Sequence, residues 1–187
     1  MNNFLNKLLT LPNILTISRM FLLPLFALGF FINSKIGLII SLVVFLFCCI
    51  TDYLDGYYAR LYKQTTKLGQ MLDPLADKIV VAIAILFIAG FQIISKSAII
   101  PAAIILCREI IISGVRDATE FSGNSFRTLF LSKCKTATQM LAISTSVLAS
   151  IVKSHITLVA GETLLWLSSL IAIVSGFIYC KRHIFSK

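Results

Sequence analysis

The chain has 187 residues, of which 58% are hydrophobic and 13% are charged, and its mean hydropathy is +0.93. Soluble domains usually contain about 25% charged residues, so this composition excludes an ordinary soluble domain and indicates a membrane protein. The formal net charge of +9 would suit a nucleic-acid-binding protein. The basic residues, however, gather toward one side of the predicted helices, which is typical of a membrane protein.

The first 12 residues are amphipathic. Apolar side chains occupy one side of a helical projection and polar ones the other, with Phe4, Leu5, Leu8 and Leu9 opposite Asn2, Asn6 and Lys7. This pattern predicts a short interfacial helix over 1–12 that leads into the first span. No small-residue cleavage pattern follows the first apolar run, so we expect no cleavable signal peptide.

Six apolar runs follow in chain order, each long enough to cross a bilayer, at 14–32, 37–59, 74–94, 97–115, 134–152 and 157–180. Six spans of about 20 residues use about 120 residues, which leaves only connectors. The sequence therefore predicts an all-α, polytopic membrane protein with six transmembrane helices in a single domain over 1–187. Pro24 and Pro101 lie inside two of these runs, where we expect kinks rather than breaks.

The basic residues divide unequally between the two sides of such a bundle. One side carries only Lys35, Lys96 and Lys153, and the other 14 of the 17 basic residues lie toward the opposite side. The positive-inside rule places the basic side in the cytoplasm, together with both termini. We expect an integral protein of a bacterial-type inner membrane whose basic residues meet lipid head groups and not nucleic acid.

Four of the eight acidic residues fall between the second and third apolar runs, namely Asp52, Asp55, Asp73 and Asp77. A carboxylate near the bilayer costs about 2.5–3.5 kcal/mol on insertion scales. Each pair shares a helix face because the spacings are i, i+3 and i, i+4, and two such charges about 4 Å apart repel by about 4 kcal/mol. Antiparallel helices would aim both pairs into one pocket. Oxygen ligands favour magnesium, manganese or calcium over zinc.

Ordinary structural explanations exist for single members of this group. Asp73 before Pro74 fits a helix N-cap, Asp77 fits a charge pair with Lys78, and Asp52 fits a pair with Arg60. None of them accounts for the four aspartates together.

The window 52–77 matches in full the pattern D-x2-D-G-x2-A-R-x8-G-x3-D-x3-D. This is the signature of the CDP-alcohol phosphatidyltransferase family, which the chain resembles over its whole length. The resemblance implies transfer of a phosphatidyl group from CDP-diacylglycerol to an alcohol with release of CMP, and a homodimer. It also implies that the four aspartates hold two Mg²⁺ or Mn²⁺ ions and that Asp77 takes the hydroxyl proton. The remaining fixed positions would bind CDP-diacylglycerol and are Gly56, Ala59, Arg60 and Gly69.

Three further segments resemble one branch of that family, the phosphatidylglycerophosphate synthases, whose acceptor is glycerol 3-phosphate. They are L-P-N-I-L-T-I-S-R at 11–19, C-R-E-I-I-I-S-G-V-R at 107–116 and S-K-C-K-T-A-T-Q at 132–139. The first segment would add CDP-diacylglycerol-binding residues, Asn13, Thr16 and Arg19. The other two would supply cations for the acceptor phosphate, Arg108, Arg116 and Lys135.

Several alternatives stay open at this point. Within the family the acceptor could be inositol phosphate, serine or phosphatidylglycerol. Arg116, Lys133 and Lys135 could instead extend to lipid head groups, and Arg108 with Glu109 could be a structural pair. Outside the family, a cation transporter could line its path with aspartates, although Arg60 would repel a passing cation.

Overall fold

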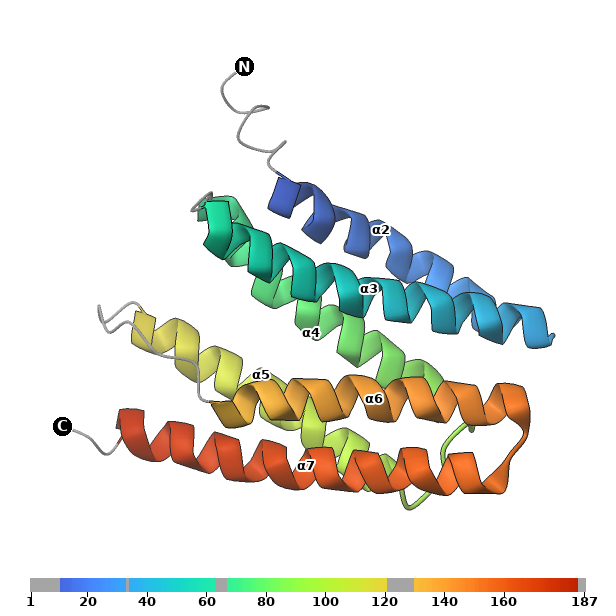
Figure 1. Ribbon diagram of the computed structural model, residues 1–187. Coiled ribbons are helices and arrows are strands. Elements are labelled where there is room, and N and C mark those ends of the chain that lie inside the picture. The colour runs from blue at the N-terminus through green and yellow to red at the C-terminus, as the bar shows by residue number, and fades with distance from the viewer. Residues whose placement is uncertain (1–10, 33, 63–66, 121–129, 185–187) are drawn as a thin grey trace. The chain divides into compact units, whose positions relative to one another are not determined.

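The computed structural model describes residues 11–32, 34–62, 67–120 and 130–184; among these, it leaves out the side chains of 11–17, 53, 55–62, 67–74, 116–120, 130, 132 and 182–184. The regular elements over this part of the chain are all helices (Figure 1): α2 Leu11–Phe31, α3 Lys35–Tyr62, α4 Lys67–Gly90, α5 Ile99–Glu120, α6 Phe130–Val152 and α7 His155–Ile184. The all-α prediction is confirmed, and every predicted apolar run falls mainly within one helix. The predicted interfacial helix lies almost entirely outside the described residues.

The helices form two compact units, Met1–Phe87 and Ile88–Lys187. In the first unit, α2 and α3 are joined by a tight turn and lie side by side (Figure 1). A Cβ atom on Gly29 would lie 2.6 Å from the carbonyl oxygen of Gly37, so only glycine permits this approach. The Ser41 hydroxyl, at the same contact, donates to the Phe26 carbonyl at 2.8 Å. Small residues thus set how closely the two helices pack.

In the second unit, α6 packs along α7, and α5 packs against α7 (Figure 1). The contact between α6 and α7 again depends on a glycine, because a Cβ atom on Gly161 would lie 2.7 Å from the Ser146 hydroxyl. The segment before α5 is tied to α7 by a hydrogen bond of 2.7 Å from the Ser95 amide to Glu162 Oε1. These contacts hold the three helices of the second unit together.

Two prolines lie differently from what the sequence suggested. α4 begins at Lys67, so Asp73 and Pro74 lie inside the helix and the N-cap explanation for Asp73 is wrong. α5 begins at Ile99, which places Pro101 in its first turn. No kink is required there, since a proline in the first turn lacks only an N–H group that would have no partner within the helix. Pro24, in contrast, lies inside α2, as predicted.

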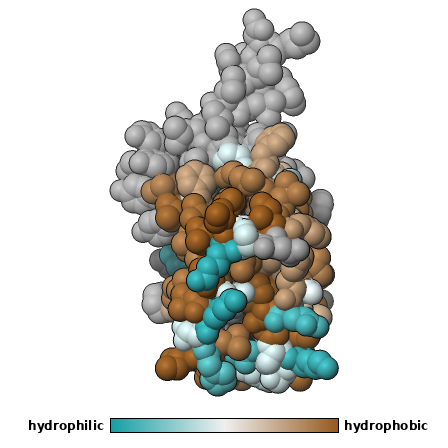
Figure 2. Space-filling view, turned by 90° about the vertical axis from the view of Figure 1, so that its right-hand side faces the viewer, coloured by the Kyte–Doolittle hydropathy of each residue, from teal (hydrophilic) through white to brown (hydrophobic). Residues whose placement is uncertain are grey.

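The surface supports a membrane protein. Among the residues whose side chains the structure describes, two helical stretches are long and apolar enough to cross a bilayer, Lys35–Asp52 and His155–Lys181, and Ser18–Phe31 is a shorter apolar stretch. Hydrophobic residues dominate the face drawn in Figure 2, and large apolar side chains such as Phe21 and Ile156 are 79% and 83% exposed. Lipid accommodates such a surface and water does not. That all six helices cross the membrane stays a prediction.

Candidate functional site

The acidic window joins the end of α3 to the first half of α4. Asp52 lies on α3 with 30% of its side chain exposed, and Asp77 lies half-buried on α4. Both carboxylates are within electrostatic range of the thiol of Cys49, which lies one turn before Asp52 on α3. The first member of the α3 pair and the last member of the α4 pair thus both act electrostatically on the Cys49 thiol, and the single pocket for all four aspartates stays a prediction.

A cation from α2 joins this acidic region. The Arg19 side chain is 1% exposed, and its guanidinium donates to Oδ1 of Asp52. A buried guanidinium requires a charged partner, because an uncompensated charge away from water is strongly destabilising. The sequence pattern predicted substrate binding for Arg19 and did not predict this ion pair, because the two residues lie 33 positions apart in the chain.

The described part of the acidic window fits a hard divalent cation but contains only half of the predicted ligands. Asp52 and Asp77 supply carboxylate oxygens, which Mg²⁺ and Mn²⁺ accept. Among the side chains that the structure describes, no group of three or more His, Cys, Asp or Glu residues is placed to hold a metal ion. The side chains of other predicted site residues lie outside that part of the chain, namely Asn13, Thr16, Asp55, Gly56, Ala59, Arg60, Gly69, Asp73 and Arg116.

The second unit contains a buried charge cluster, which we define as Arg108, Glu109 and Lys135. Oε1 of Glu109 accepts hydrogen bonds from Lys135 Nζ and from a terminal nitrogen of Arg108, the latter at 3.3 Å. The exposed fractions of the Arg108, Glu109 and Lys135 side chains are 12%, 15% and 6%. Two cations of the charge cluster thus share the carboxylate of Glu109.

Arg108 is also anchored to α7. Its Nε atom donates to the Ala172 carbonyl at 3.3 Å, and its second terminal nitrogen donates to the Ser175 hydroxyl at 3.2 Å. The charge cluster therefore connects α5, α6 and α7 and holds its cations in fixed positions. Two fixed cations with N–H donors suit a negatively charged ligand.

These contacts decide two of the alternatives left open by the sequence. The Arg108–Glu109 pair is present, as the structural-pair interpretation proposed. Lys135 is buried and bonded to Glu109, so it does not extend toward lipid head groups, whereas Lys133 is exposed and fits that description. The ion pair between Glu109 and Lys135 was not predicted, although a single acidic residue within an apolar run indicates that it needs a charged partner.

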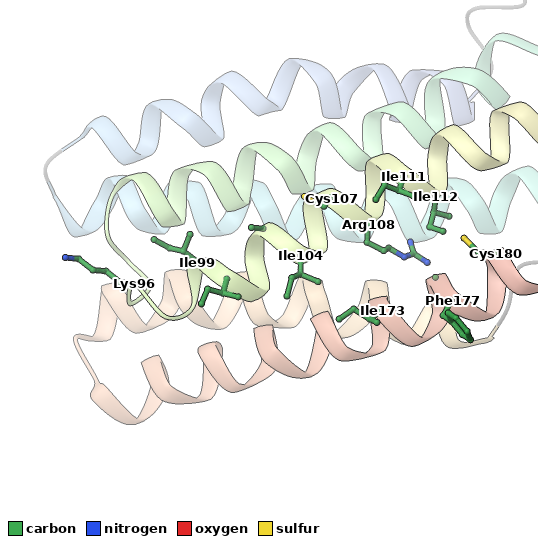
Figure 3. A pocket seen from close by; sticks show the side chains of 13 residues that line it. Lys96, Ile99, Ile104, Cys107, Arg108, Ile111, Ile112, Ile173, Phe177 and Cys180 are labelled. Carbon is green, nitrogen blue, oxygen red and sulfur yellow. The ribbon is translucent and has the colours of Figure 1, made fainter.

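An apolar groove of about 750 Å³ runs along α5 and α7 in the second unit (Figure 3). The Arg108 side chain reaches across from α5 toward α7 at one part of this groove, and Lys96 lines another part. The other lining residues are mostly aliphatic or aromatic, including Ile104, Ile111 and Phe177. The second unit thus places the charge cluster beside a surface suited to hydrocarbon.

Comparisons with known proteins agree with the aspartate pattern. The family model for CDP-alcohol phosphatidyltransferase matches residues 9–174. A protein of Rickettsia bellii (strain RML369-C), named CDP-diacylglycerol--glycerol-3-phosphate 3-phosphatidyltransferase, is 38% identical over 179 residues, covering 92% of this chain and 96% of its own. A protein of the same name from Rickettsia felis is 35% identical with the same coverage of both chains. A third, from Cereibacter sphaeroides, is 35% identical over 84% of this chain and 71% of its own.

Proposed function

This chain belongs to the CDP-alcohol phosphatidyltransferase family, and we propose that it transfers the phosphatidyl group of CDP-diacylglycerol to glycerol 3-phosphate, forming phosphatidylglycerol phosphate and CMP. Family membership makes the chain a phosphotransferase of phospholipid biosynthesis. The observation that carries the choice of acceptor is that relatives matching almost the whole chain bear the name of that reaction. The cation-transporter alternative has no comparable support.

The buried charge cluster supports an acceptor that carries a phosphate. Arg108 and Lys135, together with Arg116, would bind that phosphate, and their positive charges would meet its negative charge. Serine carries no phosphate and, as a zwitterion, would bring no net negative charge to these cations. Inositol phosphate and phosphatidylglycerol also carry phosphate, so the names of the relatives, rather than charge, favour glycerol 3-phosphate over them.

The family uses divalent cations, and we assign two of them, Mg²⁺ or Mn²⁺, to Asp52, Asp55, Asp73 and Asp77. When bound, such ions neutralise charge on the pyrophosphate of CDP-diacylglycerol and on departing CMP. The assignment is supported by the carboxylates of Asp52 and Asp77, which both act electrostatically on the Cys49 thiol. Arg19 would orient the Asp52 carboxylate, because a buried ion pair restricts the rotamers of both side chains.

Proton transfer and substrate binding complete the scheme. Asp77 would accept the proton of the acceptor hydroxyl as that oxygen attacks the phosphorus bearing diacylglycerol, and the bond from this phosphorus to the CMP oxygen breaks. Arg60 would face the phosphates of CDP-diacylglycerol, and Gly56 and Ala59 would leave space for its cytidine. The remaining residues assigned to CDP-diacylglycerol by their places in the signature and in 11–19 are Asn13, Thr16, Arg19 and Gly69.

The orientation of the enzyme follows from the distribution of charge. We place the acidic window and both termini on the cytoplasmic side of a bacterial-type inner membrane, because only three basic residues lie toward the other side. CDP-diacylglycerol would enter from the surrounding lipid and glycerol 3-phosphate from the cytoplasm. The family resemblance further suggests that the enzyme works as a homodimer.

An acceptor panel tests the proposed function. Purified enzyme receives labelled CDP-diacylglycerol, Mg²⁺ and one acceptor at a time, either glycerol 3-phosphate, inositol phosphate, serine or phosphatidylglycerol, and CMP release is measured. We expect turnover with glycerol 3-phosphate. Turnover with another acceptor and none with glycerol 3-phosphate would overturn the proposed acceptor while leaving the family assignment intact.

A further inference from the structure

Gln139 lies on α6 one turn after Lys135, and its side chain is 1% exposed. Its amide nitrogen, Nε2, is buried and has no hydrogen-bond partner among the residues that the structure describes. The other polar side chains nearby on α6 differ in this respect. The hydroxyl of Thr138, for example, donates to the carbonyl oxygens of Cys134 and Lys135, both at 2.9 Å.

A buried amide donor without an acceptor is destabilising, because it has lost its hydrogen bonds to water and gained nothing in return. Buried polar groups are nearly always satisfied, and each exception calls for an explanation such as a ligand. An apolar side chain of similar length, such as methionine, would fill the same space without this penalty. A glutamine at this position therefore indicates that its amide finds an acceptor that this part of the chain does not supply.

The surroundings of Gln139 indicate the chemistry of that acceptor. Residues four apart lie on the same helix face, so Gln139 shares its face with Lys135, which belongs to the charge cluster. The cluster contains two cations, Arg108 and Lys135, and Gln139 offers a neutral N–H donor one turn from Lys135. Both features call for the same ligand, one that brings negatively charged oxygen atoms.

We propose that Gln139 is a further acceptor-binding residue, whose amide donates a hydrogen bond to an oxygen of the glycerol 3-phosphate that Arg108 and Lys135 hold. The inference rests on the proposed function and adds a residue to it. Gln139 would add a directed hydrogen bond to the phosphate without adding charge. Arg108 and Lys135 would supply the positive charge.

The test compares Gln139→Met with the control Thr138→Val on the preceding residue. Methionine keeps the length of the side chain and removes the donor, whereas valine removes a hydroxyl that the helix backbone already satisfies. KM is measured for both substrates and Tm for the purified proteins. We expect Gln139→Met to raise the KM for glycerol 3-phosphate about tenfold, leave the KM for CDP-diacylglycerol within about twofold and leave Tm equal or higher. Thr138→Val should leave both KM values unchanged.

A second variant, Gln139→Glu, places a carboxylate beside the bound phosphate and should raise the KM for glycerol 3-phosphate more than the methionine variant does. An unchanged KM for glycerol 3-phosphate in both variants would overturn the inference. Equal increases for the two substrates, or a lower Tm in Gln139→Met, would also overturn it, because the amide would then serve folding. Failure of the proposed function is a separate result, since the unmodified enzyme would then release no CMP with glycerol 3-phosphate.

Discussion

Replacing Glu109 by glutamine tests whether the charge cluster both stabilises the second unit and binds phosphate. The change removes the carboxylate that the two cations of the cluster, Arg108 and Lys135, share. Breaking a buried ion pair costs about 3–5 kcal/mol, and we take about 3 kcal/mol because glutamine still accepts hydrogen bonds. For a chain of this length, that loss lowers Tm by about 6–12 °C.

Thermal unfolding in detergent, with and without glycerol 3-phosphate, measures the effect. The ligand should raise Tm more in Glu109→Gln than in the unmodified protein, because its phosphate replaces the missing negative charge. Glu162→Gln is the matched control, since Glu162 accepts a single hydrogen bond from the Ser95 amide elsewhere in the same unit. It should cost about 1.5 kcal/mol and leave the effect of the ligand unchanged. An unaltered Tm in Glu109→Gln, or equal ligand effects in all three proteins, would refute the reasoning.

Three further predictions concern the metal ligands, the acceptor and the packing of α2. Asp77→Asn should abolish CMP release, and EDTA should do so reversibly in the unmodified enzyme, with activity restored by Mg²⁺ or Mn²⁺; full turnover in EDTA would rule out the metal assignment. Arg108→Ala should raise the KM for glycerol 3-phosphate about tenfold or more and that for CDP-diacylglycerol less, because a hydrogen bond to a charged group contributes about 1.5–3 kcal/mol. Gly29→Ala should cost about 1–3 kcal/mol, since the new Cβ atom would lie 2.6 Å from a backbone oxygen. Gly114→Ala is its control in thermal unfolding, because a Cβ atom there meets nothing within 4 Å, and equal Tm values for the two variants would contradict the packing argument.

The six helices α2 to α7 could be predicted because each apolar run is long enough to form one and is separated from the next by polar residues. The beginning of α4 could not, because Gly69 and the Asp73-Pro74 pair are typical of a connector and a helix start, although Leu68, Met71 and Leu72 have the i, i+3, i+4 spacing of a helix face. A helix there continues through Pro74, whose missing N–H removes only one hydrogen bond. Hydrophobic patterns thus identify the buried part of a helix better than its ends.

In the candidate site, too, local sequence patterns predict some features and not others. The spacing of the aspartates predicts one pocket for both pairs, since that depends on two helices joined by a short connector, and this stays a prediction. The pairing of Arg19 with Asp52 depends instead on how closely α2 approaches α3, and the bond from Lys135 to Glu109 depends on how α6 packs in the second unit. Such contacts depend on which helices pack together, and the spacing of residues along the sequence does not reveal that.

The close contact of α2 with α3 has a consequence for the biogenesis of the protein. Arg19 alone, carried into a bilayer on α2, would cost about 2.5–3.5 kcal/mol, and so would Asp52 alone on α3. Because Gly29 and Ser41 let the two helices pack tightly, they can leave the translocation machinery as one hairpin in which the two charges already neutralise each other. We therefore expect α2 and α3 to insert together, and a ribosome-bound chain that ends before Asp52 to hold α2 less stably in the membrane than one that includes it.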